Sequence, residues 1–487
     1  MRPTRPVRLR PSRQARRRRT RPVRRSPRHP ELPPAARQTN RGPADRSHGE
    51  HAVDIILYSI PLFFVLIGLE LAVQAWTGRR LFRLADSVAD LSCGILSQFA
   101  GIATKALLLA VYIWVAERFA LQHWTGLPAW PEGSPFATWA GFPGFRVRGA
   151  ELASWAAVFV LVDLAYYWTH RLSHEVNLLW AGHVVHHSSE EYNLTVALRQ
   201  SALHGLFTWV FYVPLALLGV PWEMFATSYA LNLVYQFWIH TRAVGRMSRW
   251  AEAVLNTPSH HRVHHGVDPK YQDRNYAGVF IVWDRLFGTF QPEEEEPVYG
   301  ITTPLRSWNP LWANVHVFWQ ILRDAARART WRERLLYVFG PPGWRPEDEG
   351  GRVRPKPVDR DRYQPWDTRV PGGLAAYGFV QFLGALVAAF ALLWFAGALP
   401  AAELAAGAFY VTVALVGVAG VFESARWAPP IEMARLLTLA GAAVVLGVRG
   451  SLPSVAAAGL AVACLASIVW LLRYRNVFVE DEMAPVM

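Results

Sequence analysis

Long apolar runs alternate with polar segments along the whole chain of 487 residues. An uncharged stretch of about 20 residues can cross the hydrocarbon core of a bilayer as an α-helix. This pattern predicts an all-α integral membrane protein with five spans in its first half and four more after residue 369. The expected spans are 55–78, 91–116 (one long helix or two pieces), 153–169, 203–220, 225–239, 370–402, 404–422, 436–448 and 450–472.

Polar segments between these runs suggest a division of the chain. We expect a histidine-rich helical domain that caps a transmembrane bundle, with a polar amphipathic helix over residues 186–201, and a separate set of C-terminal membrane helices. The expected segments are 1–50 (disordered Arg/Pro-rich tail), 51–150 (N-terminal spans and an interfacial loop), 151–330 (catalytic domain), 331–373 (Pro- and Gly-rich linker), 374–475 (four-span bundle) and 476–487 (tail).

The basic charge of the protein is confined to its N-terminus. Residues 1–50 contain 16 arginines and three acidic residues, so they carry the entire formal net charge of +13, and the rest is balanced. The favoured interpretation is a solvated cytoplasmic tail, and contact with anionic lipid is the alternative. No aromatic residues interleave with the arginines, so we expect no nucleic-acid partner.

The C-terminal spans are rich in Ala, Gly, Val and Leu and contain no histidine and few polar residues. They are expected to be a scaffold with small-residue packing faces, with lipid binding as an alternative role. Cys93 and Cys464 both lie in apolar runs and predict neither a disulfide framework nor an iron–sulfur cluster. No glycine-rich phosphate or dinucleotide motif is present, so any redox chemistry requires an external electron donor.

Histidines are concentrated in one part of the chain. Eleven of the 16 lie between His170 and His265, and most are three or four residues apart. On a helix this spacing places side chains on one face, so each cluster becomes a patch of imidazoles pointing one way. One metal takes about three or four protein ligands, and the number of histidines therefore predicts two metals. The predicted ligands are His170, His174, His183, His186, His187, His240, His261, His264 and His265.

Four further side chains accompany this set. Asp163 lies within an apolar span, seven residues before His170, and is expected to accept a hydrogen bond that fixes a ligand's tautomer. Glu175 is expected either to do the same or to move a proton, with a surface carboxylate as the alternative. His260 is either a ligand or a residue that supports one, and His204 is expected to be an interfacial side chain.

Imidazole alone does not identify the metal. All the clusters lie just outside apolar spans, so a lipid chain held in the bundle could present a carbon atom to the site. Attack on an unactivated C–H bond requires activated O2 and a redox metal, which excludes zinc. We therefore expect two iron ions, O2 as co-substrate and a membrane lipid as substrate. The non-enzymatic alternative is a metal transporter or store, which predicts polar residues deep inside the C-terminal spans.

The order of the motifs resembles the fatty-acid hydroxylase and sterol desaturase superfamily over roughly residues 155–290. A closer resemblance, to the alkylglycerol monooxygenase family, lies in 183–195, 197–201, 235–241, 256–265, 275–276 and 283–290. It implies di-iron ligation by the motif histidines and a functional role for Glu175. It also implies oxidation of an ether lipid next to the ether oxygen, with a reduced pterin as electron donor. Related sequences act on sterols, carotenoids or fatty acyl chains, and these remain alternative substrates.

The orientation in the membrane raises a conflict. A cytoplasmic tail followed by three full spans would put His170 on the far side of the membrane, away from a cytosolic reductant. We expect the active site on the cytoplasmic side, with a re-entrant segment within residues 84–119 that keeps it there. The basic pair Arg79 and Arg80 in the first turn supports this expectation.

Overall fold

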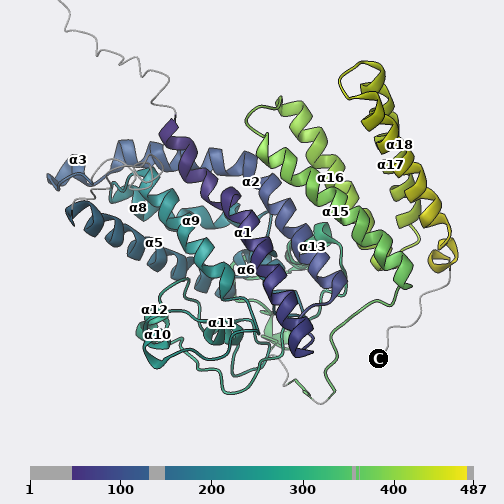
Figure 1. Cartoon of the computed structure of the whole chain (residues 1–487). Helices are drawn as coiled ribbons and strands as arrows, with labels where there is room; N and C mark the ends of the chain where they lie inside the picture. The colour runs from purple at the N-terminus through teal and green to yellow at the C-terminus, as the bar shows by residue number, and fades with distance from the viewer. Residues whose placement is uncertain (1–46, 131–148, 354–357, 361, 480–487) are drawn as a thin grey trace, which may run out of the picture. The chain divides into compact units, whose positions relative to one another are not determined.

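The computed structural model describes residues 47–130, 149–353, 358–360 and 362–479. Within these ranges the helices are joined by turns and loops, and the remaining secondary structure consists of two isolated β-bridges, Leu255 with Phe280 and Gly266 with Tyr299 (Figure 1). The prediction of an all-α protein is therefore confirmed. The expected disorder of residues 1–46 and the tail at 480–487 lie outside the described residues, as do residues 131–148 of the interfacial loop.

The helices before residue 300 are α1 (Ser47–Thr77), α2 (Leu84–Phe119), α3 (Gln122–Thr125), α5 (Gly149–Glu175), α6 (Asn177–His187), α7 (His204–Thr208), α8 (Val213–Leu217), α9 (Trp222–Trp238), α10 (Arg249–Val254), α11 (Pro258–His264) and α12 (Val282–Phe287). The later helices are α13 (Pro310–Arg327), α14 (Trp331–Phe339), α15 (Gly372–Trp394), α16 (Ala401–Phe422), α17 (Ala428–Val448) and α18 (Ser454–Leu472). Short 3-10 turns at Val196–Leu198, Trp209–Tyr212, Glu347–Glu349 and Arg475–Phe478 complete the assignment.

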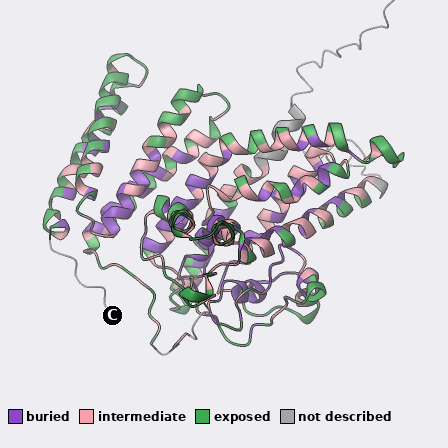
Figure 2. Cartoon of the chain, turned by 180° about the vertical axis from the view of Figure 1, so that it is seen from behind, coloured by how far each residue is buried: buried purple, intermediate pink, exposed green. Residues whose placement is uncertain are grey.

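Seven helices in the described part of the chain are long and apolar enough to cross a membrane, and they include α1, α2, α5 and α15 to α18. Only 17% to 44% of the most apolar stretch of each is buried within the protein. Figure 2 shows much of α15 to α18 in the colours of exposed or partly exposed residues. So much exposed apolar surface requires lipid around it, and the chain is a multi-pass membrane protein.

One of the nine expected spans, 203–220, was wrong, and the span expected at 225–239 corresponds to α9, which is not among these seven helices. Residues 203–220 form an apolar helical run from His204 to Leu217 that is divided by a 3-10 turn. At 1.5 Å per residue these 14 residues reach about 21 Å, which is short of the roughly 30 Å hydrocarbon core. Pro214 contributes no backbone N–H inside this run. α9 has 17 residues and packs against α1 and α5.

Of the two alternatives for residues 91–116, one long helix is the correct one, because α2 is continuous over 36 residues. The expected re-entrant segment within residues 84–119 stays a prediction. Another correction concerns residues 186–201, where the predicted amphipathic helix is absent. α6 ends at His187, and the side chains of Ser189, Asn193 and Thr195 then bond to backbone or carboxylate groups. Such local side-chain bonds compete with helix formation.

The C-terminal helices are attached to the rest of the molecule and are more polar inside than their sequence indicated. One hydrophobic cluster joins residues of α2 with residues of α15 and α16. Within the bundle Glu432 is fully buried, and Arg435 Nη2 lies 2.5 Å from its carboxylate. Tyr377 donates to Glu432, and Arg435 also donates to Gln381. Sequence analysis missed this network because it began the third C-terminal span at residue 436, whereas α17 begins at Ala428.

Candidate metal centre

The three histidine motifs lie at the ends of three helices. His170 and His174 occupy the last two turns of α5, and the chain reverses at Val176 to begin α6. The last turn of α6 carries the second motif, and α11 carries the third, with His265 immediately after its end. His240 follows the end of α9.

The structure sorts all nine predicted ligands into two groups. In each group one ring nitrogen per residue lies within 4.8 Å of those of all other members. The group of five contains His170, His174, His183, His187 and His264; the group of four contains His186, His240, His261 and His265. Each HxxHH motif therefore contributes its first and last histidine to one group and its middle histidine to the other. The histidines of each HxxHH motif, which were expected to point one way together, are therefore divided between the two groups.

Distances between ring nitrogens fit ligation of a cation. In the group of five, His187 Nε2 lies 3.2 Å from His183 Nε2 and 3.1 Å from His264 Nε2. In the group of four, His240 Nε2 lies 3.2 Å from His186 Nε2 and 3.0 Å from His261 Nε2. Ligands at a metal–nitrogen distance of about 2.1 Å stand roughly 3.0 to 3.4 Å apart. Each group can therefore hold one ion.

Backbone carbonyl groups orient four of the imidazoles. The Nδ1 atoms of His170, His186, His240 and His264 lie 2.7, 3.2, 2.8 and 2.9 Å from the carbonyl oxygens of Tyr276, Arg199, Gln236 and Arg274. A proton held on Nδ1 by such a carbonyl leaves the Nε2 lone pair free for a metal. Buried Nε2 atoms without a hydrogen-bond partner occur on His170, His174 and His265, as expected of metal ligands.

The burial of the site keeps its imidazoles neutral. Burial lowers the pKa of His240 to about 3 and that of His264 to about 4. Burial, together with repulsion from neighbouring imidazoles, also holds the pKa of five more ligands well below the ordinary value: His183, His186, His187, His261 and His265. A metal ligand must be the neutral imidazole, so the protein environment favours the ligating form.

Asp163 lies next to the site without contacting a histidine. Its carboxylate accepts hydrogen bonds from Asn232 Nδ2 at 2.6 Å and Trp283 Nε1 at 2.9 Å. It also accepts from the backbone N–H groups of Val279 and Phe280 at 2.8 and 3.0 Å. The tautomer of His170 is set instead by the Tyr276 carbonyl. Asp163 therefore holds the segment that carries this carbonyl.

Glu175 is on the outer side of the site. Its carboxylate is exposed and receives a hydrogen bond of 2.9 Å from Arg171 Nε, one helical turn earlier. His204 Nε2 lies 3.0 Å from Ser173 Oγ, and its ring neighbours that of His183. His260 is buried against Phe290 and belongs to neither histidine group.

Sequence reasoning did not single out Tyr276. Its side chain is fully buried, and its ring lies against those of His170, His174 and His264, with centroids 5.3 to 5.9 Å apart. Among the described residues its hydroxyl has no hydrogen-bond partner. Desolvation raises the pKa of this phenol well above its ordinary value. It is a neutral hydrogen-bond donor beside the group of five.

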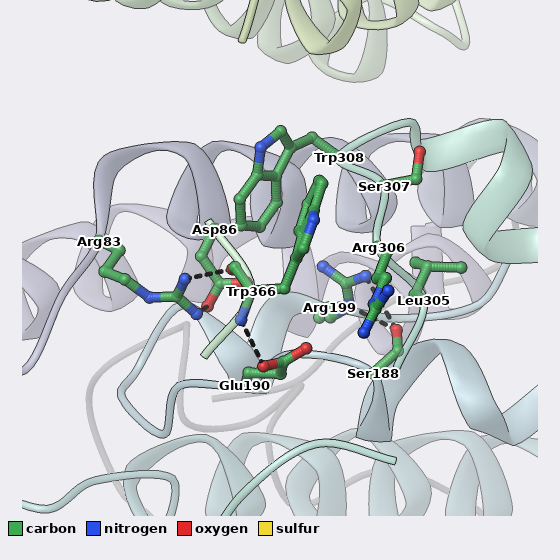
Figure 3. Close-up of a pocket in the computed structure, with 10 residues that line it drawn as sticks. All are labelled: Arg83, Asp86, Ser188, Glu190, Arg199, Leu305, Arg306, Ser307, Trp308 and Trp366. Atoms are coloured by element: carbon green, nitrogen blue, oxygen red, sulfur yellow. Dashed lines mark hydrogen bonds and ion pairs between the residues drawn. The ribbon is translucent and has the colours of Figure 1, made fainter. Parts of the chain in front are cut away.

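Sequence reasoning also did not single out Arg199, which supports the group of four. Its guanidinium is fully buried, lies 3.1 Å from Asp90 of α2, and donates to the Val185 carbonyl and Ser188. Its own carbonyl contacts His186. Figure 3 shows Arg199 and Ser188 beside a polar cavity of about 10 Å³, which has room for about one water molecule and excludes a lipid chain.

Comparison with known proteins places these residues in a family. A family model described as "Fatty acid hydroxylase" matches residues 155–289, which include all nine histidines. Alkylglycerol monooxygenase of Xenopus tropicalis is 38% identical over 69% of this chain and 70% of its own length. The chain belongs to the alkylglycerol monooxygenase family. The proteins of that name from Homo sapiens and Danio rerio are 37% and 38% identical over 70% and 66% of this chain, and 71% and 67% of their own lengths.

Membership of this family makes the chain an oxygen-dependent oxidoreductase, as predicted. No solved structure matches the chain. The geometry of the two histidine groups fits the iron of an oxygen-dependent monooxygenase, because neutral imidazole is a common iron ligand.

Proposed function

We propose that this chain is a membrane-bound di-iron monooxygenase that hydroxylates an alkyl ether lipid at the carbon next to the ether oxygen. The observation that carries the proposal is the convergence of nine imidazoles, eight of them buried, on two adjacent points. Three relatives named alkylglycerol monooxygenase support the substrate class. In the proposed site each histidine group holds one ion.

Two bound iron ions would supply the activation of O2. One oxygen atom enters the C–H bond and forms a hydroxyl group. The other leaves as water, with two electrons and two protons from an external donor, which we propose is a reduced pterin. The hemiacetal product breaks its C–O bond and gives a fatty aldehyde and the glycerol alcohol. Because no nucleotide motif occurs in the sequence, the electrons come from outside the chain.

The chain's own residues position this reaction. Backbone carbonyls fix the tautomers of four ligands, and the Tyr276 hydroxyl is available to donate a hydrogen bond beside the group of five. Asp163 is assigned a positioning role, since it holds the backbone of residues 279 and 280. Glu175 lies at the exposed outer edge next to His174 and is assigned to proton transfer or to contact with the reductant.

The centre is proposed to face the cytoplasm, where a reductant is available. Arg79, Arg80 and Arg83 lie in the short turn between α1 and α2, on the same side as the histidines, because Arg83 Nε bonds to Glu191 at 2.7 Å. Basic residues in short loops favour the cytoplasmic side. If α1 crosses the membrane, this placement replaces the cytoplasmic tail that the sequence favoured. A cysteine introduced at exposed Glu294 and labelled with an impermeant reagent tests this placement. Labelling only in permeabilised cells is expected, and labelling of intact cells would overturn it.

An oxygen-uptake assay tests the reaction. Purified protein in lipid nanodiscs, loaded with iron, should consume O2 with an alkylglycerol and a reduced pterin, and should release fatty aldehyde. The variant His186→Ala should abolish this uptake, while His123→Ala, at an exposed position outside both groups, should retain it. Aldehyde release unaffected by His186→Ala would exclude the proposed site.

The same assay separates the alternatives. Turnover of a sterol or a fatty acyl lipid, without turnover of an alkylglycerol, would keep the metal centre and replace the substrate. Stoichiometric metal without oxygen uptake on any of these lipids would favour a metal-binding protein without catalysis.

A further inference from the structure

The helix α13 begins where a membrane span ends. Glu423 directly follows α16, and its Oε1 atom accepts hydrogen bonds from Ser307 Oγ at 2.8 Å and from the backbone N–H of Trp308 at 2.5 Å. Trp308 packs in the cluster that joins α2 and α16, and α13 starts two residues later, at Pro310. The start of α13 is therefore fixed at the border of the hydrocarbon layer.

α13 is not itself a membrane span. It has 18 residues, it is not among the helices apolar enough to cross, and it carries Arg323, Asp324 and Arg327 towards its C-terminal end. Its apolar residues are concentrated on one side instead. A helix of this kind, with one apolar and one cationic side, is suited to lie in the membrane interface.

The sides of α13 are clearly divided. At 100° per residue, five apolar residues occupy one sector of the helix surface, and each is between 41% and 61% exposed. The adjoining sector carries the exposed Gln320, Arg323 and Arg327. The face towards the protein buries Ala313, Asn314 and Ile321. The exposed apolar stripe comprises Leu311, Trp312, Val315, Trp319 and Leu322.

α14 repeats this arrangement. Trp331, Leu335 and Phe339 follow each other at intervals of four residues and are 70%, 44% and 57% exposed. Exposed Arg332 and Arg334 flank this second stripe. Residues 310–339 contain five arginines and two acidic residues, so the segment is cationic beside its exposed aromatic side chains.

We propose that α13 and α14 lie in the plane of the membrane, with both apolar stripes in the interfacial layer and the arginines against the phosphates of anionic lipids. Trp is enriched at this depth because its ring is amphipathic. Basic residues near an anionic surface strengthen membrane binding. A second copy of the chain could cover the stripes, but arginines on its own surface would repel those beside them.

This contact also bears on the metal centre. Asn314 of α13 accepts a hydrogen bond of 2.8 Å from the backbone N–H of Ala202. At the other end, the α14 carbonyl of Tyr337 and the adjacent Gly340 carbonyl accept bonds of 2.8 and 2.9 Å from Asn177, the first residue of α6. α6 ends at His187. The helix pair thus fixes the depth of the histidines relative to the lipid headgroups, whatever the reaction is.

Site-directed spin labelling of the full chain tests the proposal. Trp319→Cys places a nitroxide on the apolar stripe, and Gln320→Cys is the matched control on the adjoining polar sector. Cys93 and Cys464 are buried, and the unsubstituted protein gives the background. In nanodiscs with anionic lipid, the ratio of O2 to nickel-chelate accessibility should be several-fold higher at position 319 than at 320. Leu335→Cys and Arg332→Cys should repeat the contrast on α14.

Two outcomes would overturn the proposal. Equal access of the nickel chelate to positions 319 and 320 would mean that the stripe faces water. An immobilised label at 319 protected from both reagents would mean that protein covers it. In nanodiscs of phosphatidylcholine alone, the contrast between the two positions should decrease, and an unchanged contrast would remove the role of anionic lipid.

Discussion

His186 and His240 approach each other to 3.2 Å between their Nε2 atoms, although 54 residues separate them in the chain. The first belongs to α6 and the second follows α9, so the group of four forms only when these two helices are packed correctly. The backbone carbonyls that receive the opposite ring nitrogens belong to Arg199 and Gln236. The metal centre therefore depends on residues that never contact the metal.

Asp90 is one such residue, and Asp90→Asn should weaken the group of four. The substitution leaves the buried guanidinium of Arg199 without its carboxylate partner. Removing one partner of a buried ion pair lowers the free energy of unfolding by about 3 to 5 kcal/mol. Mutation of a residue that orients a metal ligand typically lowers metal affinity about 10- to 100-fold. The measurement is metal content against free metal, with thermal unfolding in detergent. Asp348→Asn, which removes the exposed partner of Arg329, should change neither.

Tyr276→Phe should lower turnover without loss of stability. The hydroxyl has no partner in the described structure, so its removal leaves no group unpaired. It is also the phenol that packs against three ligands of the group of five. We expect kcat to fall roughly 10-fold or more with KM and metal content unchanged. Tyr299→Phe removes another unpartnered buried hydroxyl, on a ring that packs against Tyr192 instead of against a histidine, and should have wild-type kcat. Equal kcat in both variants would rule out a role for Tyr276 in the reaction.

The metal-free protein should lose stability as the pH falls below about 6.5, the ordinary pKa of histidine. In the unfolded chain the imidazoles take up protons in this range, whereas burial holds the pKa of His240 at about 3 and that of His264 at about 4. The unfolded state then binds more protons than the folded state, so acid favours unfolding. Thermal midpoints of metal-stripped protein between pH 7.5 and 5 measure this slope, which His240→Ala should reduce. A midpoint that rises towards pH 5 would contradict this assignment of neutral histidines.

The buried pair in the C-terminal bundle should affect stability and not chemistry. Glu432→Gln leaves Arg435 charged and without a carboxylate partner between membrane helices, at a cost of about 3 to 5 kcal/mol. The yield of folded protein should therefore fall, while turnover per folded, iron-loaded molecule stays the same. Glu403→Gln, at the exposed start of α16, is the control. A selective loss of turnover in Glu432→Gln would give these helices a direct part in the reaction.

Spacing of three and four residues singled out eight of the nine histidines that the structure gathers into two groups, and the position of His240 after an apolar run singled out the ninth. Their role as metal ligands stays a prediction. The spacing could not predict how the set divides, since His183, His186 and His187 share one side of α6. Their division depends on α5, α9 and α11, which approach from distant parts of the chain. Apolar composition also predicted a membrane span at residues 203–220, but the helical run there is too short to cross the membrane. Because the sequence analysis began the third C-terminal span at residue 436, it overlooked Glu432 and Arg435, which lie just before that residue. The backbone carbonyl groups that orient four of the imidazoles could not be predicted either, because every residue has such a group and a single sequence does not show which one lies beside a histidine.

The number of iron ions per chain tests the central claim most directly. Protein loaded under anaerobic conditions and analysed by elemental analysis, with Mössbauer spectroscopy on iron-57, should contain two irons per chain. His240→Ala, which removes one member of the group of four, should retain about one iron, and His123→Ala should retain two. A single zinc ion in active protein, or two irons unaffected by the loss of His240, would contradict the two-centre account.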